Sequence, residues 1–245
     1  MKATLTYHSI DDSESPVSLA PATFQRHVAW LASGRVKVLG LDALLAHPED
    51  GEDAVALTFD DGFLNNDDPV RRLLDAGLPA TLFVVSRYVG TTNAWGGYGD
   101  RRIPVLPLLS WDDLGGLIER GASVAAHSRT HAPMTSLSPF ALDDELLGCV
   151  DDLHTRLGLR ASHLAYPYGD VDERVAARAE HHFRFGHTTA FDMLRSTAPR
   201  LQLPRLDMYY FQKPGTLEAW GTPAFARRVS WCRTRRRARA WLVGS

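Results

Sequence analysis

The pattern of apolar and polar positions along this chain predicts both strands and helices. Segments such as 55–59 and 80–85 are almost continuously apolar, which is typical of strands buried on both faces of a parallel sheet. Elsewhere apolar residues recur at spacings of four and three, as at Phe24, Val28 and Leu31, which indicates an amphipathic helix. The predicted strands are 3–8, 36–39, 55–59, 80–85, 122–126, 163–166 and 183–188, and the predicted helices are 21–31, 41–46, 69–76, 111–120, 139–157, 172–180 and 217–241.

This alternation predicts an α/β fold in which helices cover a mostly parallel sheet. No internal repeat or low-complexity linker divides the 245 residues, so we expect a single domain with a basic helical extension at about 217–245. Residues 86–110 form a long irregular segment rich in glycine and proline. Loops of this length inside a domain are usually functional or disordered.

Composition excludes several classes of function. The formal net charge is −2, so no overall charge attracts the chain to nucleic acid. The sequence contains no run of about 18 apolar residues, so it predicts no transmembrane segment. The N-terminal MKATLTYHSI lacks the apolar core of a signal peptide, so we expect a cytoplasmic location. The two cysteines, Cys149 and Cys232, lack the spacing of a metal site, and the sequence leaves the oligomeric state open.

The C-terminal segment is locally basic despite the overall charge. Arginines cluster between residues 227 and 239, interleaved with Trp231 and followed by Trp241. The simpler interpretation is a solvated basic helix face. The alternative is a surface that contacts anionic lipid or an acidic partner.

Residues with catalytic potential follow two of the predicted strands. The stretch ALTFDDGF, residues 56–63, carries Asp60 and Asp61 directly after an apolar run, where buried carboxylates need compensation; alone, it indicates only a turn. His127 and His131 follow another strand, and a helical turn would place both imidazoles on one face. Because parallel strands end at the same edge, a carboxylate and two imidazoles can meet there as a ligand set typical of catalytic zinc.

A third predicted strand runs into YPYG at 166–169, which alone indicates only a strand and a turn. ALTFDDGF, HSRTH at 127–131 and YPYG, in this order, resemble the polysaccharide deacetylases, carbohydrate esterase family 4. YHSI at 7–10 and PATLFV at 79–84 fit the same pattern, so the resemblance covers roughly residues 3–210. It implies a distorted (β/α) barrel. It also implies a metal-dependent hydrolase that removes the N-acetyl group of an amino sugar in an oligosaccharide, glycoside or biosynthetic intermediate, and releases acetate.

The resemblance also implies roles for individual residues. Asp61, His127 and His131 would bind a divalent metal, most simply Zn²⁺, although Co²⁺, Mn²⁺ and Ni²⁺ suit the same ligands. Asp60 would be the general base. The backbone N–H of Tyr168 would complete an oxyanion hole.

Two positions depart from the family pattern. Ala165 stands where many members have an arginine that orients the base, and Arg205 is the predicted replacement. The Leu-x-His motif, whose histidine protonates the leaving amine, is missing from the sequence. We predict His187 for this acid, and His8, at the end of the first strand, as a further site residue.

Aromatic residues near these motifs are candidates for sugar binding. Tyr166 is predicted to contact substrate, and Trp95, Tyr98 and Trp111 can stack on sugar rings or serve only in packing. Two other functions stay open: hydrolysis of a non-sugar amide or ester at the same metal site, and carbohydrate binding without catalysis. Asp60 argues against the second, because a binding protein has no evident use for a base.

Overall fold

The computed structural model describes residues 1–95 and 102–243, with the backbone alone for 237–243. The strands are β1 (Lys2–Tyr7), β2 (Ser9–Ile10), β3 (Ser18–Leu19), β4 (Lys37–Val38), β5 (Ala54–Phe59), β6 (Ala80–Val84), β7 (Ser123–Ala126), β8 (His163–Ala165), β9 (Phe185–His187) and β10 (Leu206–Asp207). The α-helices are α1 (Pro21–Leu31), α2 (Leu41–Ala46), α3 (Asp67–Asp75), α4 (Trp111–Glu119), α5 (Pro139–Leu157), α6 (Glu173–Ala179) and α7 (Pro223–Val243).

All the predicted segments correspond to these elements. The largest displacement is at the last helix, which begins at Pro223 instead of near residue 217. The two-residue strands β2, β3 and β10 were not predicted, whereas β4, also of two residues, lies within the predicted strand 36–39.

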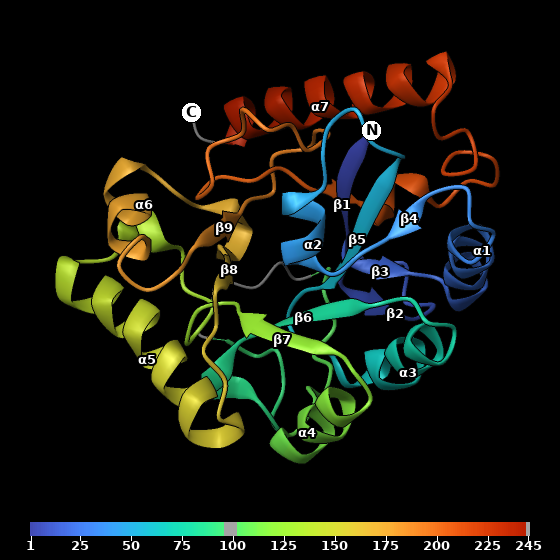
Figure 1. Cartoon of the computed structure of the whole chain (residues 1–245). Helices are drawn as coiled ribbons and strands as arrows, with labels where there is room; N and C mark the ends of the chain where they lie inside the picture. The colour runs from blue at the N-terminus through green and yellow to red at the C-terminus, as the bar shows by residue number, and fades with distance from the viewer. Residues whose placement is uncertain (96–101, 244–245) are drawn as a thin grey trace.

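Eight strands form one sheet in the order β10-β1-β5-β6-β7-β8-β9, with β4 also paired to β5, and its pairings are parallel. One edge of β5 serves two neighbours, because Ala54 and Val55 pair with β4 and the last residues of the strand pair with β6. Figure 1 shows the sheet curled, with most of the helices around its outside and α2 across the centre of this view. The architecture is therefore the expected distorted (β/α) barrel.

Residues 203–207 connect the two ends of the curled sheet. Leu203 forms a parallel bridge with His187 of β9, and β10 pairs with β1 a few residues later. Arg205 therefore lies between the two strands that this segment contacts. The position of this arginine depends on the closure of the barrel.

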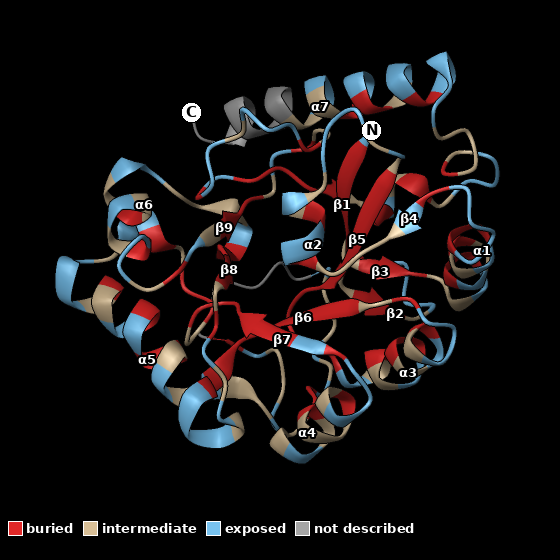
Figure 2. Ribbon diagram, in the orientation of Figure 1, coloured by how far each residue is buried: buried red, intermediate tan, exposed pale blue. Residues whose placement is uncertain are grey.

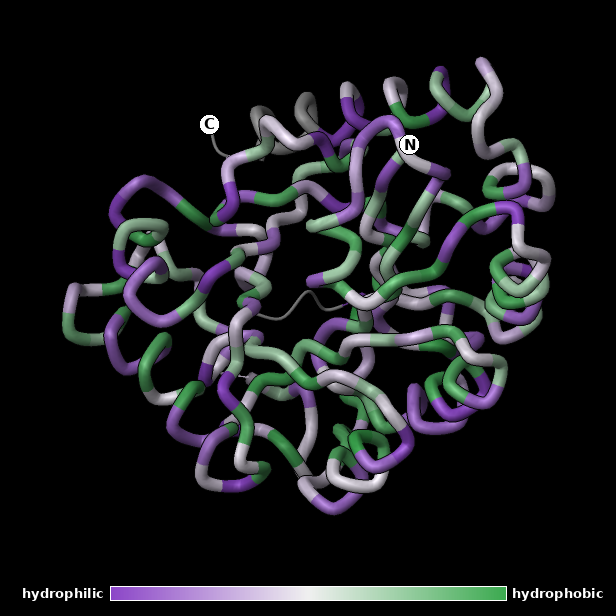
Figure 3. The backbone as a smooth tube through the Cα atoms, viewed as in Figure 1, coloured by the Kyte–Doolittle hydropathy of each residue, from purple (hydrophilic) through white to green (hydrophobic). Residues whose placement is uncertain are grey.

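The core explains why the strands read as continuous apolar runs. Every residue of β1, β5 and β6 is buried, and Figure 2 shows buried strands surrounded by helices with exposed outer faces. Figure 3 shows hydrophobic stretches along the interior segments and hydrophilic positions on the outer helices. A strand covered on both faces has no polar face, so period-two alternation is lost.

Helix α5 begins and ends at residues that its sequence indicates. The Ser138 hydroxyl accepts a hydrogen bond from the Ala141 N–H (3.3 Å), with Pro139 at the first helical position. Gly158 ends the helix with a left-handed φ of 68°. The cap therefore fixes where α5 begins to cross the outside of the sheet.

Helix α7 packs along the barrel in Figure 1. Its inner face buries Phe225, Val229 and Cys232, and Arg233 pairs with Asp192 at 2.7 Å. One face of α7 is therefore buried against the barrel, and a solvated basic face stays a prediction for its other side, where Arg227 and Arg235 are exposed. In the described part of the chain, no helix is long and apolar enough to cross a bilayer.

Candidate active site

A cavity of about 770 Å³ opens where β1, β5, β7 and β8 end. The carboxyl ends of parallel strands are where α/β barrels place their active groups. The residues that line it are His8, Pro16, Val17, Asp60, Asp61, Phe63, Asn93, Ala94, Trp95, Ile103, Val105, His127, His131, Tyr166, Tyr168 and Thr189. The three motifs that are far apart in the sequence therefore meet in one cavity.

The two aspartates point to different partners because the backbone turns between them. The N–H of Asp60 still donates to the Tyr7 carbonyl at 2.9 Å, which continues the pairing of β5 with β1. Asp61 and Gly62 then adopt left-handed φ values of 71° and 75°. A Cβ on Gly62 would lie 3.2 Å from Val84 Cγ1. Glycine therefore allows the tight turn that separates the carboxylates.

The two histidines lie in a loop after β7, so the prediction that they share a helical face is wrong. Ser128 and His131 have left-handed φ values of 62° each, and the Ser128 hydroxyl accepts from the His131 N–H at 3.0 Å. From α5, Glu145 Oε2 accepts from the N–H groups of Arg129 and Thr130, both at 2.9 Å. Glu145 was missed in the sequence, where its signal is a carboxylate among the apolar positions of a helix.

Asp61, His127 and His131 converge on one point. Asp61 Oδ1 lies 3.2 Å from His127 Nε2 and 3.3 Å from His131 Nε2. His127 Nδ1 donates to the Ala165 carbonyl at 2.8 Å, which leaves its Nε2 with a free lone pair in the neutral ring. Asp61 Oδ1 is buried without a hydrogen-bond partner among the described residues. Lone pairs that face one another in this way fit a bound divalent metal.

Tyr168 and Trp95 hold the His131 ring in place. The Tyr168 hydroxyl lies 3.0 Å from His131 Nδ1, and the Trp95 ring centroid lies 4.5 Å from that of His131. Tyr168 has a left-handed φ of 61°, and a Cβ on the following Gly169 would lie 2.3 Å from Thr189 Oγ1. The YPYG turn is thus shaped by its neighbours as well as by its own residues.

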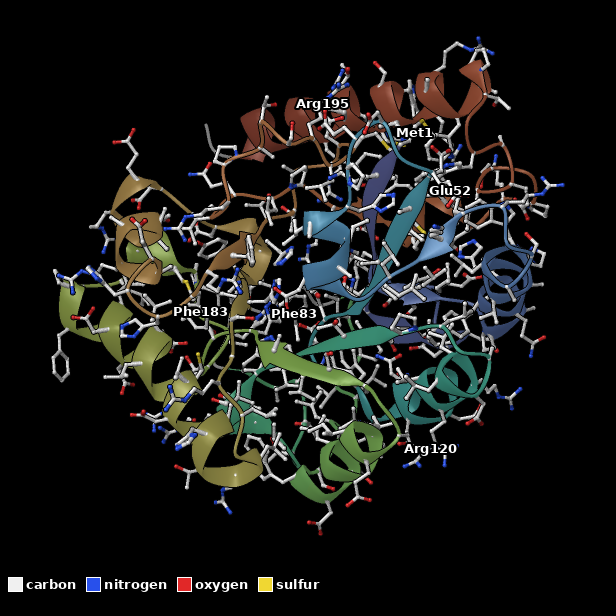
Figure 4. All side chains as sticks on the ribbon, viewed as in Figure 1. Met1, Glu52, Phe83, Arg120, Phe183 and Arg195 are labelled. Atoms are coloured by element: carbon white, nitrogen blue, oxygen red, sulfur yellow. The ribbon has the colours of Figure 1, made fainter. Side chains whose placement is uncertain are left out.

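Asp60 forms a buried ion pair with Arg205. The guanidinium Nη1 and Nη2 donate to the two carboxylate oxygens at 2.7 and 2.8 Å, and Nε donates to the Thr188 carbonyl at 3.0 Å. The guanidinium also lies over the ring of Phe83, 5.6 Å from its centroid; Figure 4 labels Phe83 in the interior. Burial disfavours the charged carboxylate, but Arg205, His127 and His8 outweigh it, so the pKa of Asp60 lies below its usual value.

Comparison with known proteins identifies the family of this site. Residues 47–185 match the polysaccharide deacetylase family. The chain belongs to this family. The match includes the aspartate pair, the histidine loop and the YPYG turn, so the resemblance predicted from these motifs is confirmed.

Solved structures show the polysaccharide deacetylase fold along most of the chain. A polysaccharide deacetylase from Bacillus cereus is 23% identical (TM-score 0.73) and covers 93% of this chain and 68% of its own. IcaB from Ammonifex degensii is 19% identical (TM-score 0.73), and the match covers 95% of this chain and 97% of IcaB. The Streptococcus pyogenes deacetylase PplD, solved with acetate, is 18% identical (TM-score 0.72) and covers 84% and 91%. These likenesses confirm the distorted (β/α) barrel.

A curated relative matches only in part. A Bacillus gellan lyase is 30% identical over 131 residues, which are 53% of this chain and 4% of that protein. The chain therefore spans only a small part of that relative's length.

The predicted acid, His187, lies outside the cavity of this deacetylase-family chain. It is fully buried in β9, where its Nε2 lies 3.0 Å from His163 Nδ1. Burial, with smaller effects from His163 and Arg205, lowers the pKa of His187 well below its usual value. The geometry therefore gives His187 no path to a leaving group, whereas His8 lines the cavity with its Nε2 3.8 Å from Asp60 Oδ2.

The aromatic candidates differ in how far they reach the cavity. Tyr166 contributes to the wall but is fully buried, and its hydroxyl has no partner among the described residues. Trp95 also lines the cavity, but its side chain is largely covered. Trp111 packs against the core from α4, and Tyr98 lies outside the described residues.

Proposed function

We propose that this protein is a metal-dependent N-deacetylase that releases acetate from an N-acetylated amino sugar. The observation that carries the proposal is the convergence of Asp61, His127 and His131 beside an ionised Asp60, in a cavity large enough for a sugar unit. Membership of the polysaccharide deacetylase family supports a hydrolase that removes acetyl groups. The residues suit Zn²⁺, and the same nitrogen and oxygen ligands also suit Co²⁺, Mn²⁺ or Ni²⁺.

Asp61, His127 and His131 would hold the divalent metal, which would supply a Lewis acid for lowering the pKa of water and polarising the acetamide carbonyl. Asp60 accepts the proton of the attacking water. Its ion pair with Arg205 keeps the carboxylate charged and in one orientation, because both oxygens are held by the same guanidinium. The backbone N–H of Tyr168, in the turn after β8, stays our prediction for oxyanion stabilisation.

His8 replaces His187 in this proposal as the residue that protonates the leaving amine. Its side chain is partly exposed in the cavity and lies beside the base. Asn66 Nδ2 donates to the His8 carbonyl at 2.6 Å, which holds its backbone at the end of β1. The imidazole therefore lies inside the cavity, where a leaving amine would form.

Acetate release tests the proposal. Metal-loaded wild-type protein is incubated with N-acetylglucosamine and its oligomers, beside Asp60→Asn protein and chelator-treated protein. We expect release from at least one saccharide that requires both the metal and Asp60. Equal release by wild-type and Asp60→Asn protein would contradict the proposed base. No release from any saccharide by protein with bound metal would contradict the substrate class.

A second function, hydrolysis of a non-sugar acetyl amide or ester, is favoured by the apolar mouth of the cavity. Val105 lines the cavity and is 67% exposed, and Pro16, Val17 and Ile103 line the same cavity. Adding acetanilide and p-nitrophenyl acetate to the panel separates the functions. Turnover of acetanilide without turnover of any saccharide would favour the second.

A further inference from the structure

A second cavity, of about 540 Å³, adjoins the candidate active site. The chain after β9 forms one side and α7 forms the other, and Thr189 lines both cavities. Three arginines line the second cavity, Arg195, Arg233 and Arg236, together with one carboxylate, Asp192. Asp192 pairs with Arg233 at 2.7 Å, and Asp207, which does not line the cavity, pairs with Arg236 at 3.3 Å. The charge of Arg195 is therefore left in excess at this cavity, in a chain whose formal net charge is −2.

Arg195 and Arg233 keep donors available to a ligand, whereas Arg236 already donates to Asp207 and to the Thr189 carbonyl. Arg233 Nη1 pairs with Asp192 at 2.7 Å, and this side chain is 39% exposed. Arg195 is exposed and lines the cavity together with residues of α7, and Figure 4 labels it at this helix. A guanidinium carries five N–H donors, and the contacts that the described residues make with Arg233 use one of its nitrogens. Such groups bind carboxylate and phosphate through paired hydrogen bonds.

Hydrogen bonds connect this cavity to the candidate metal site. Arg236 Nη2 donates to the Thr189 carbonyl at 3.1 Å. The Thr189 hydroxyl donates to the Tyr168 carbonyl at 3.1 Å, and the Tyr168 hydroxyl lies 3.0 Å from His131 Nδ1. One residue, Thr189, thus forms the shared wall, so a ligand bound by the arginines lies next to the site of the proposed reaction.

We propose that the second cavity binds a carboxylate or phosphate group of an anionic saccharide while an N-acetyl group of the same molecule occupies the active-site cavity. The proposal rests on the proposed deacetylase function and adds to it the substrate class, an acidic glycan. A cavity lined by three arginines has no corresponding use for a neutral chain of N-acetylglucosamine.

Two tetrasaccharides test the proposal. Tetra-N-acetylchitotetraose, called chitotetraose below, is neutral, whereas hyaluronan tetrasaccharide alternates N-acetylglucosamine with glucuronate. We expect wild-type protein to have a KM about fivefold lower for the hyaluronan tetrasaccharide at low ionic strength, and expect added salt to reduce the difference, as for partly exposed ion pairs. In Arg195→Gln protein the KM for this saccharide should rise toward that for chitotetraose. The matched control, Arg227→Gln, removes an exposed arginine of α7 that does not line the cavity, and should preserve the preference.

Equal KM values for the two saccharides in wild-type protein would overturn the proposal, as would equal effects of Arg195→Gln and Arg227→Gln. Calorimetric titration with inorganic phosphate distinguishes a site for a free anion from a site for an anionic saccharide. Phosphate binding without a preference for the charged saccharide would also overturn the proposal. If neither saccharide releases acetate, the proposed function fails, and calorimetry then tests separately whether the second cavity binds an anionic saccharide. Binding of hyaluronan tetrasaccharide that Arg195→Gln weakens supports the cavity proposal, and an absence of binding overturns it.

Discussion

Arg205 and Asp60 are joined by two hydrogen bonds of 2.7 and 2.8 Å although 145 residues separate them in the chain. Both side chains are buried. Arg205 reaches the carboxylate from the segment that connects β9 with β1, so the pair joins the first and last parts of the barrel. The base of the proposed reaction is therefore held by the element that completes the fold.

Replacing Arg205 should destabilise the protein and inactivate it. In Arg205→Met protein the Asp60 carboxylate stays buried without its partner, so we expect the free energy of unfolding to fall by about 3 kcal/mol or more. Acetate release should fall by about 100-fold or more, because the base is no longer oriented or kept charged. Urea denaturation and kcat/KM on the best saccharide measure the two effects.

The double variant Asp60→Asn/Arg205→Met separates the two effects. Neutralising both partners removes the unpaired buried charge, so stability should recover above that of Arg205→Met protein while activity stays lost. Purely additive losses of stability in the three variants would show that the pair is not coupled.

His8→Gln should affect substrates according to their leaving groups. An N-acetyl amide needs a proton on the departing amine, so we expect its hydrolysis to slow by about 100-fold. p-Nitrophenolate leaves without protonation, so p-nitrophenyl acetate hydrolysis should change by about twofold or less. Equal losses on both substrates would contradict a role as the acid. His187→Gln is the control, because His187 is buried outside the cavity. Its replacement should affect the free energy of unfolding more than it affects the ratio of amide to ester hydrolysis.

The local parts of the fold could be predicted from the sequence because their causes are local. The strand 54–59 is almost continuously apolar, Ser138 and Pro139 begin α5, and Gly158 ends it with a left-handed φ. His127, His131 and one carboxylate of the aspartate pair were also predicted to meet, because each follows a strand at the same edge of a parallel sheet, and the family resemblance selected Asp61 as that carboxylate. Short-range patterns are sufficient for such features.

The parts of the site that depend on barrel closure were harder to predict. The sequence indicated Arg205 only as a replacement for a missing residue, and its carboxylate partner became visible only in the folded chain. His187 follows a strand pattern like that of the ligands, but the curl of the sheet places it in the interior beside His163. The loop at 127–131 brings the two imidazoles together through left-handed backbone conformations at Ser128 and His131. The side chains of these two residues do not predict such conformations.

Tyr166→Phe should leave catalysis unchanged although the residue was predicted to contact substrate. Its hydroxyl is buried without a partner among the described residues, and a Cβ on Gly186 would lie 2.5 Å from it. Removing an unsatisfied hydroxyl should leave the free energy of unfolding unchanged or raise it by about 1 kcal/mol. An increase in KM for the saccharide would instead assign the hydroxyl to substrate binding. Tyr168→Phe, whose hydroxyl contacts His131, is the matched comparison and should lower metal affinity.

Removing a metal ligand should abolish metal binding and the stability that it provides. We expect one Zn²⁺ per wild-type chain by elemental analysis, and a gain of about 2.7 kcal/mol in the free energy of unfolding when free Zn²⁺ is 100 times its Kd. Asp61→Ala and His127→Ala protein should show neither effect. His154→Ala removes an exposed histidine and should behave as wild type. Zn²⁺-dependent stabilisation of Asp61→Ala protein equal to that of wild type would place the metal elsewhere.

His27 should make folding sensitive to mild acid. It is buried between the Tyr7 hydroxyl (3.3 Å from Nδ1) and the Phe211 carbonyl (3.1 Å from Nε2). Burial lowers the pKa of His27 to about 4, although the Phe211 carbonyl opposes the shift. Between pH 6.5 and 4 the unfolded chain therefore binds a proton at this residue that the folded chain does not, so stability is full above pH 6.5 and is lost as pH falls.

This shift corresponds to about 3 kcal/mol across the window. Urea denaturation of the wild-type chain at a series of pH values should show a free energy of unfolding that falls steadily below pH 6.5. His27→Gln removes the titrating group and keeps a donor and an acceptor, so its profile should be flatter by that amount. The exposed His154→Gln variant should keep the wild-type slope. Identical slopes for the wild-type and His27→Gln proteins would show that other groups control the acid sensitivity, foremost the buried His187, whose pKa is also depressed.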